Sequence, residues 1–198
     1  MGQVKAGGDL DRRDVVRALL ADRKDLLVVT GLGSASYDVM AAGDHDNNYY
    51  LWAAMGSAAM VGLGIAATQP DKPVLVLTGD GESLMGFGAL ATIALRRPRN
   101  LTLAILDNGH FGETGMQESH AGRGIEFDQV AAACGFPHTG RITDMAGVQS
   151  LRDDIYKQDG LRLFTLKIKP ENLPRVLPPR DGVHVKNRFR MALGHQPI

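Results

Sequence analysis

The sequence GDGESLMGFGALATIALRRPRNLTLAILDNGHFGETGMQ, residues 79–117, together with the apolar run before it, decides the fold. That run, residues 74–77, leads into Gly79-Asp80-Gly81, and a second apolar run, residues 101–106, ends in Asp107-Asn108-Gly109. A helix-like segment lies between the two runs. This arrangement is typical of neighbouring parallel strands joined by a crossover helix. Both strands then end at the carboxyl edge of the sheet, where open α/β sheets bind their ligands.

Asp80 and Asn108 each follow one of these runs, so we expect them to lie close together in space. A carboxylate and an amide oxygen are hard ligands that suit Mg²⁺, which keeps phosphate oxygens and water as further ligands. Gly-Asp-Gly alone is also ordinary turn chemistry. The strand on each side and the position of Asn108 at the end of the second strand favour the metal site.

The Gly-Asp-Gly sequence, followed after 26 residues by Asn108, resembles the cofactor motif of the thiamine-diphosphate-dependent 2-oxo acid decarboxylases. The resemblance implies that the side chains of Asp80 and Asn108 bind Mg²⁺ together with the main-chain carbonyl of His110. It also implies that N–H groups around Gly81 approach the diphosphate at the start of the following helix.

Residues 53–56, Ala-Ala-Met-Gly, resemble the Gly-Ser-Met-Gly sequence that many members carry upstream of Gly-Asp-Gly. The resemblance implies that Met55 props the cofactor in a bent shape and that the Ala53 carbonyl accepts a hydrogen bond from its pyrimidine amino group. An ordinary core methionine is the alternative for Met55. Glu82 stands where members often have Ser, and we expect it to point away from the diphosphate while Ser83 supplies the hydroxyl. The cofactor-binding residues implied by the resemblance are Ala53, Met55, Gly79, Asp80, Gly81, Glu82, Ser83, Asn108, His110, Phe111 and Gly112.

The glycine-rich segment 107–124 is too long to be a simple connection and carries the remaining catalytic candidates. Glu113 and Thr114 lie just past the expected metal site, so we expect them to reach the diphosphate or the substrate. His120 is a further candidate, with a surface imidazole as the alternative. The candidate catalytic residues are therefore Met55, Glu113, Thr114 and His120.

Two polar segments keep more than one interpretation open. Gly31 and Gly33 fit either a strand-to-helix turn or a second close approach to a ligand. Residues 44–50 contain His, Asp and Asn, but adjacent loop residues seldom converge on one ion. A solvated or subunit-contacting loop is the favoured interpretation there.

Composition fits one globular domain of 198 residues, with 44% hydrophobic and 22% charged residues. We find neither an apolar run of membrane-spanning length nor a leader pattern, and Cys134 is the only cysteine, so we expect a cytoplasmic protein. From Lys167 onward seven Lys or Arg oppose two acidic residues, which gives that segment a charge of +5. No broad basic face with aromatics is present, so neither nucleic acid nor membrane is an expected partner.

The order of the patterns predicts a three-layer α/β/α fold with a mostly parallel central sheet. Residues 1–170 form the expected cofactor-binding domain, and residues 171–198 an extended basic C-terminal tail. We expect strands at 26–30, 74–78, 101–106, 138–142 and 161–168. We expect helices at 9–23, capped by Asp9, and at 36–42, 59–68, 84–96, 127–134 and 144–158.

In this family an activating Glu comes from a separate pyrimidine-binding domain, which these 198 residues leave no room for. We therefore expect a β subunit that works with an α subunit carrying that Glu, in a dimer of heterodimers or a larger assembly. Asp107-Asn108-Gly109 and the Gly-Glu-Thr-Gly loop resemble sulfopyruvate decarboxylase β chains and phosphonopyruvate decarboxylases. The expected reaction is decarboxylation of a small anionic 2-oxo acid, first of all sulfopyruvate. The alternatives are phosphonopyruvate decarboxylation, a carboligase of the acetolactate synthase kind, and a non-catalytic cofactor-binding module.

Overall fold

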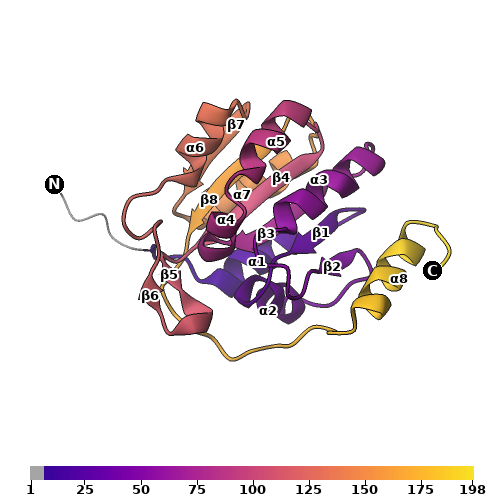
Figure 1. The fold of residues 1–198 in the computed structure, drawn as a ribbon, viewed down its shortest axis with the longest axis horizontal. Coiled ribbons are helices and arrows are strands. Elements are labelled where there is room, and N and C mark those ends of the chain that lie inside the picture. Colours follow the sequence, from indigo (N-terminus) through magenta and orange to yellow (C-terminus); the bar gives the residue numbers. More distant parts are fainter. Residues whose placement is uncertain (1–6) are drawn as a thin grey trace.

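The computed structural model describes residues 7–198, and its centre is a six-stranded sheet in which every neighbouring pair is parallel (Figure 1). The strand order is β2-β1-β3-β4-β8-β7, so β2 and β7 are the two edge strands and the first strand, β1, lies next to the β2 edge. The expected mostly parallel sheet is confirmed. The strands are β1 (Leu27–Thr30), β2 (Asn48–Tyr50), β3 (Val74–Gly79), β4 (Leu101–Asp107), β7 (His138–Ile142) and β8 (Arg162–Lys167).

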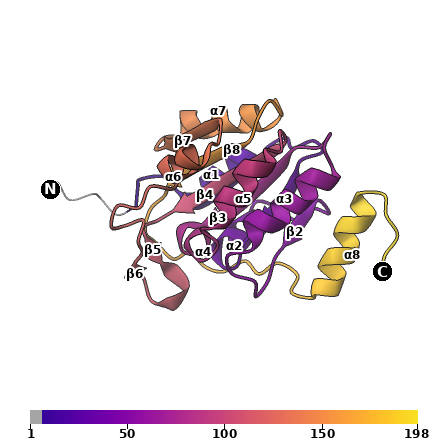
Figure 2. The same cartoon turned by 45° about the horizontal axis from the view of Figure 1, so that its top comes forward.

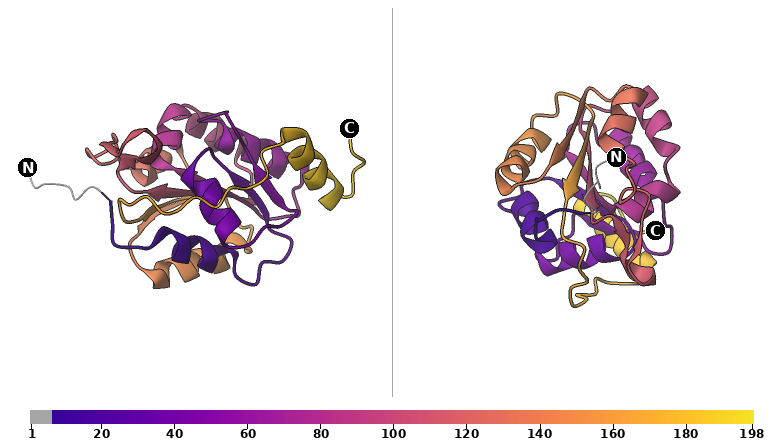
Figure 3. Two further views of the ribbon diagram at one scale, coloured as in Figure 1. Left: turned by 90° about the horizontal axis from the view of Figure 1, so that it is seen from below. Right: turned by 90° about the vertical axis from the view of Figure 1, so that its left-hand side faces the viewer.

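Helices cover both faces of this sheet, which gives the three expected layers (Figure 3). The central strands are buried on both sides, as in β4, where all seven residues are buried. One face packs against α1 (Arg12–Leu20), α2 (Ser34–Ala41) and α7 (Met145–Ile155). The other packs against α3 (Ala58–Thr68), α5 (Ala89–Arg96) and α6 (Phe127–Cys134), as Figure 2 shows.

Several expected boundaries are wrong for identifiable physical reasons. Asp11, not Asp9, caps the first helix, because its carboxylate accepts the N–H groups of Arg13 and Asp14. The expected loop at 44–50 contains strand β2, which pairs with β1 at the edge of the sheet.

The expected helix at 84–96 is two helices, α4 (Asp80–Met85) and α5. Gly86 separates them because its backbone lies against Gly56: a Cβ on Gly86 would be 2.0 Å from the Gly56 carbonyl oxygen. The long segment after β4 also has structure of its own. It folds into a hairpin of β5 (His110–Phe111) and β6 (Gln117–Glu118) around a 3₁₀ turn, Gly112–Thr114.

The C-terminal tail is not extended throughout, which corrects the expectation for residues 171–198. Residues 171–181 form a strap without helix or strand that crosses the molecule from the end of β8 toward the β2 edge (Figure 3). Helix α8 (Gly182–Ala192) follows, capped by Asp181 and packed beside β2 (Figure 1). Val185 and Phe189, one helical turn apart, are its buried residues, so the apolar side of this helix is narrow. Within the part of the chain that the structure describes, we find no helix long and apolar enough to cross a membrane.

Candidate functional site

The carboxyl ends of β1, β3 and β4 surround a cavity of about 240 Å³. The polar residues that follow strands β3 and β4 both lie at this cavity. They come together because the two strands pair in register, from Val74 opposite Leu101 to Gly79 opposite Leu106. Its lining contains eleven residues expected from the sequence: Met55, Gly79, Asp80, Gly81, Glu82, Asn108, His110, Phe111, Gly112, Glu113 and Thr114. Ala53, Ser83 and His120 are outside this lining, and His120 is exposed beside the ring of Phe111.

Asp80 is the first residue of α4, directly after β3, and its side chain is buried. The Ser119 hydroxyl donates a hydrogen bond of 2.5 Å to its Oδ2. Burial raises the pKa of Asp80 to about 6; the Ser119 hydrogen bond opposes this increase, whereas the charge of Asp107 adds to it. Within residues 7–198 we find no lysine or arginine paired with the Asp80 carboxylate. This is a buried anionic oxygen donor suited to a cation.

Asn108 follows β4, and its side chain is held by the turn that comes after it. Its Oδ1 accepts the N–H of His110 at 2.9 Å, while the His110 ring nitrogen Nδ1 lies 2.8 Å from the Asn108 carbonyl oxygen. An amide oxygen has two lone pairs, so Oδ1 keeps one for a further partner. Next to it, Asp107 accepts the N–H of Gly109 and is paired with Lys167 at 2.6 Å. Asp107 thus has a cationic partner inside the protein, whereas Asp80 has none among residues 7–198.

Glu82 points toward the β1 side of the cavity. Its Oε2 accepts the Thr78 hydroxyl at 2.5 Å, and a Cβ on Gly31 would lie 1.3 Å from the same atom. Gly31 is therefore the residue that makes room for this carboxylate. Burial raises the pKa of Glu82, opposed by hydrogen bonds from Thr78 and from the N–H groups of Ala58 and Gly56.

Met55 lies at the opening of the cavity and is 42% exposed. Its Cε is 3.9 Å from the point that a Gly81 Cβ would occupy, and the Phe111 ring is only 2.8 Å from that point. Gly81 thus lets the Phe111 ring pack directly against the backbone of the Gly-Asp-Gly motif, where a larger residue would clash with it. Ala53, two residues before Met55, has a left-handed backbone conformation with φ of 60°.

Glu113 and Thr114, in the turn between β5 and β6, close one side of the cavity. Glu113 is held by Arg175 of the strap at 2.8 Å and lies 3.4 Å from the Ser34 hydroxyl. The Arg175 guanidinium is also 5.7 Å from the centre of the Tyr37 ring. The strap therefore fixes the position of the turn that carries the catalytic candidates.

Three residues around this site were missed from the sequence: Arg12, Ser119 and Arg175. Arg12 did leave a signal, because it shares a helical face with Val15, Val16 and Leu19 and yet is charged. Ser119 and Arg175 are 39 and 62 residues away from their partners Asp80 and Glu113, and no local pattern marks them.

The donor set fits magnesium and a phosphorylated cofactor. It combines a buried carboxylate oxygen and an amide oxygen with a spare lone pair, in a cavity whose lining includes Gly79 and Gly81. Within residues 7–198 we find no cluster of three or more His, Cys, Asp or Glu able to hold a metal.

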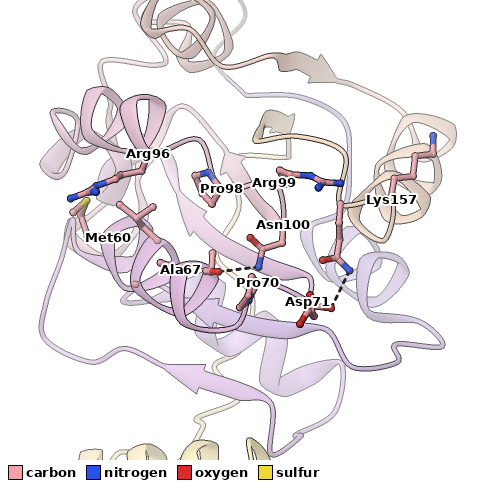
Figure 4. Close-up of a pocket in the computed structure, with 13 residues that line it drawn as sticks. Met60, Ala67, Pro70, Asp71, Arg96, Pro98, Arg99, Asn100 and Lys157 are labelled. Atoms are coloured by element: carbon pink, nitrogen blue, oxygen red, sulfur yellow. Dashed lines mark hydrogen bonds between the residues drawn. The ribbon is translucent and has the colours of Figure 1, made fainter.

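A larger cavity of about 850 Å³ lies at the opposite, amino edge of the sheet (Figure 4). Its wall includes Asn100, whose amide donates to the carbonyls of Ala66, Gln69 and Lys72 at the end of α3. Arg96, Arg99, Lys157 and Asp71 lie around it, and no residue of the Gly-Asp-Gly motif is near. Its polar groups complete the end of a helix, so it is not our candidate site.

These features define a doubly wound α/β protein with its ligand site at the carboxyl edge of the sheet, the class that binds phosphorylated cofactors. Residues 32–165 match the family model of the thiamine pyrophosphate enzymes, C-terminal TPP binding domain. The chain belongs to this family and carries its thiamine-diphosphate-binding domain. The family expected from the sequence is confirmed.

Among curated relatives, the chain is similar to three decarboxylase sequences. It is 31% identical to sulfopyruvate decarboxylase subunit beta of Methanococcus maripaludis, over 93% of this chain and 98% of that one. It is 32% identical to sulfopyruvate decarboxylase of Methanosarcina acetivorans, over 92% of this chain and 47% of that one. It is 37% identical to phosphonopyruvate decarboxylase of Streptomyces viridochromogenes, over 88% of this chain and 44% of that one. The chain thus spans about half the length of the latter two.

Among solved structures, benzoylformate decarboxylase from Polynucleobacter necessarius has a TM-score of 0.71 at 14% identity, over 88% of this chain and 36% of that one. A 4-hydroxybenzoylformate decarboxylase from Rhodococcus jostii has a TM-score of 0.68 at 19% identity, over 85% and 34%. At these identities the likeness establishes the fold alone.

Proposed function

We propose that this chain is the β subunit of a two-subunit, thiamine-diphosphate-dependent 2-oxo acid decarboxylase. The observation that carries the proposal is the match to a sulfopyruvate decarboxylase β subunit over nearly its whole length. The proposed reaction converts sulfopyruvate to sulfoacetaldehyde and CO₂.

In this proposal the side chains of Asp80 and Asn108 and the carbonyl of His110 bind Mg²⁺. Residues 79–83 offer main-chain N–H groups to the diphosphate, and Met55 supports the cofactor at the cavity opening. The burial of the Asp80 carboxylate supports this assignment, because a divalent cation would compensate a charge that the described protein groups leave unpaired.

Bound thiamine diphosphate supplies a carbon nucleophile and an electron sink for the loss of CO₂. The contribution of this chain is to bind and orient the cofactor and to enclose the cavity in which it reacts. Asp80 and Asn108 fix the anionic end of the cofactor, and the Gly112–Thr114 turn closes the cavity beside it. Glu113 and Thr114 are the side chains that we propose to face the substrate.

An α subunit would supply the pyrimidine-activating Glu and much of the substrate pocket. Two β-subunit relatives, from Methanococcus maripaludis and Methanothermobacter thermautotrophicus, support a divided enzyme, since the chain covers 98% and 94% of their lengths. We also propose a cytoplasmic location, in keeping with the single, unpaired cysteine among the described residues, Cys134.

The test is CO₂ release by the purified complex with its partner, supplied with thiamine diphosphate and Mg²⁺. We expect release from sulfopyruvate, and a loss on the order of 100-fold or more in Asp80→Asn, which keeps the shape and removes the charge. Asp71→Asn, at the opposite edge of the sheet, is the matched control. A complex that binds the cofactor but releases CO₂ from none of the 2-oxo acids tried would contradict the proposal.

Phosphonopyruvate is the second candidate substrate, favoured by the 37% identity to a phosphonopyruvate decarboxylase. Parallel assays with the two substrates decide between them, because they differ in the group on C3. If a 2-hydroxy ketone forms by ligation to a second carbonyl compound instead of free aldehyde, the carboligase alternative replaces both. If Mg²⁺ and thiamine diphosphate do not bind at all, the chain is a non-catalytic relative.

A further inference from the structure

Arg12 is a buried arginine whose side chain lines the cofactor cavity, although it comes from the first helix. It is the first residue of α1, and Asp11 before it caps the helix. Its side chain is only 6% exposed and shares the inward face of α1 with Val15 and Val16. Arg12 also lies 20 positions before residues 32–165, the part that matches the family model, so that match gives it no role.

The guanidinium of Arg12 is hydrogen-bonded through its Nε atom, whereas its two terminal amino groups remain available. Its Nε donates to Asp38 Oδ2 at 2.6 Å. Within residues 7–198 this is the only hydrogen bond that the Arg12 guanidinium makes, so both terminal amino groups keep their donors for the cavity. A guanidinium presents its donors as a planar fork that matches two oxygens of one anion.

Asp38 does not fully compensate the positive charge of the two neighbouring arginines, Arg12 and Arg13. Its other oxygen, Oδ1, lies 3.7 Å from Nε of Arg13, so one carboxylate is shared between two guanidinium groups. Arg13 turns away from the cavity, with its terminal amino group on the Pro174 carbonyl. Asp38 is thus one carboxylate between two guanidinium groups, of which the buried Arg12 lines the cavity.

The other charged residues in the cavity lining are all carboxylates, so Arg12 differs from them in the sign of its charge. Arg12 is the only lysine or arginine among the described lining residues, and the carboxylates there are Asp80, Glu82 and Glu113. Glu113 is already paired with Arg175, which stands outside the lining. A buried cation with unused donors is costly unless an anion completes it.

We propose that Arg12 is the anion anchor of this cavity, binding a tetrahedral oxyanion through its two terminal amino groups while Asp38 fixes its orientation. The inference rests on the proposed function, which supplies two sources of that chemistry: the terminal phosphoryl group of the diphosphate and the sulfonate of the substrate. Asp38 is a positioning residue, since it acts only through Arg12.

The test is calorimetric titration of the complex with thiamine diphosphate in saturating Mg²⁺, followed by measurement of KM for sulfopyruvate. Arg12→Lys keeps a cation for Asp38 but loses the fork, so we expect an affinity about 10- to 100-fold weaker for whichever ligand it holds. Arg13→Lys is the matched control, on the same helix and beside the same carboxylate but outside the cavity, and it should leave both constants unchanged.

Weaker cofactor binding in Arg12→Lys identifies the diphosphate as the anion, whereas a raised KM with unchanged cofactor affinity identifies the sulfonate. Unchanged values for both ligands would overturn the inference. If Arg12→Lys does not fold, Arg12→Met/Asp38→Asn removes both buried charges together and is titrated in its place, with the same two outcomes. Failure of the proposed function is distinct, because the wild-type complex itself would then bind no cofactor or release no CO₂.

Discussion

Ala53 adopts a left-handed backbone conformation, φ 60°, that residues with a side chain seldom adopt. For L-residues this conformation costs about 1–2 kcal/mol, because Cβ approaches the following carbonyl oxygen. Ala53 stands at the position of the first Gly in the Gly-Ser-Met-Gly sequence that this segment resembles. The backbone there has the left-handed conformation that Gly adopts without strain.

We predict that Ala53→Gly stabilises the protein by about 0.5–1 kcal/mol, since relief of the left-handed strain exceeds the extra freedom of Gly in the unfolded chain. The measurement is the free energy of unfolding from urea titration. Ala54→Gly is the matched control, because Ala54 has no positive φ to relieve and should lose stability. Equal effects at the two positions would show that Ala53 is not strained.

At the residue scale, the sequence predicted the side chains that belong to local motifs and missed those that arrive from elsewhere. Asp80 and Asn108 were found because each follows an apolar run, and parallel strands bring such ends together. Arg12 and Ser119 join the same site from a helix before the sheet and from the turn after β6. Their positions depend on packing between distant segments, which spacing along the chain does not encode.

Among the elements, the break between α4 and α5 depends on contact between two glycine backbones. We predict that Gly86→Ala destabilises the protein by about 1–3 kcal/mol or more, because the new Cβ would lie 2.0 Å from the carbonyl oxygen of Gly56. The midpoint of urea unfolding measures the loss.

Gly88→Ala, two residues further on, is the matched control. Its Cβ would meet nothing within 4 Å, and its φ of −62° is ordinary, so we expect a change within about 1 kcal/mol. If both variants lose stability equally, the Gly56–Gly86 approach is not what separates the two helices.

The docking of α8 depends on an ion pair between Arg188 and Asp44, at 2.6 Å. The pKa of Asp44 is lowered overall: burial alone would raise it, but hydrogen bonds from Arg188, Tyr50 and the His45 N–H outweigh burial. A carboxylate with a lowered pKa in the folded state adds stability above its unfolded pKa and loses it as pH falls through the folded value.

We therefore predict that Asp44→Asn costs about 1 kcal/mol at pH 6 and progressively less as the pH falls below about 4. The measurement is the difference in unfolding free energy between wild type and variant across this range. Asp46→Asn, whose nearest approach to Arg188 is 3.8 Å and whose side chain is 71% exposed, is the control and should show a smaller difference. A difference for Asp44→Asn that does not change with pH would contradict the assignment.

At this scale two elements were predicted at their observed bounds, the helix Phe127–Cys134 and the strand His138–Ile142. The buried strands β3 and β4 were predicted to within one residue. Strand β2 and helix α8 were missed because neither has a strong period of its own. β2 is three residues long and buries polar Asn48, and α8 buries only Val185 and Phe189. β2 is held by its pairing with β1, and α8 packs against β2.

For the whole molecule, cofactor binding should appear as thermal stability. A ligand at 100 times its Kd adds about 2.7 kcal/mol, which for a chain of this size raises Tm by about 5–10 °C. We predict this rise for the complex with its partner only when thiamine diphosphate and Mg²⁺ are both present, because in the proposed function Asp80 and Asn108 would hold the Mg²⁺ that accompanies the diphosphate.

Differential scanning calorimetry with each component alone, with both, and with both plus EDTA measures the effect. Asn108→Asp is an informative variant, because it keeps an oxygen ligand and should retain most of the rise, whereas Asn108→Leu should lose it. A rise that EDTA leaves unchanged would mean that the cofactor binds without the metal.

The position of α8 has one more consequence, for what this protein can attach to. A terminal strand of a sheet offers free N–H and carbonyl groups to any other extended chain. Here Arg188 already donates to the Asn48 carbonyl at 3.3 Å, and the Phe189 ring stands edge-on to that of Tyr49 at 5.4 Å. Helix α8 thus covers the edge strand β2. We therefore expect that two copies of this protein cannot pair their sheets through β2, and that fibrils cannot grow from this edge.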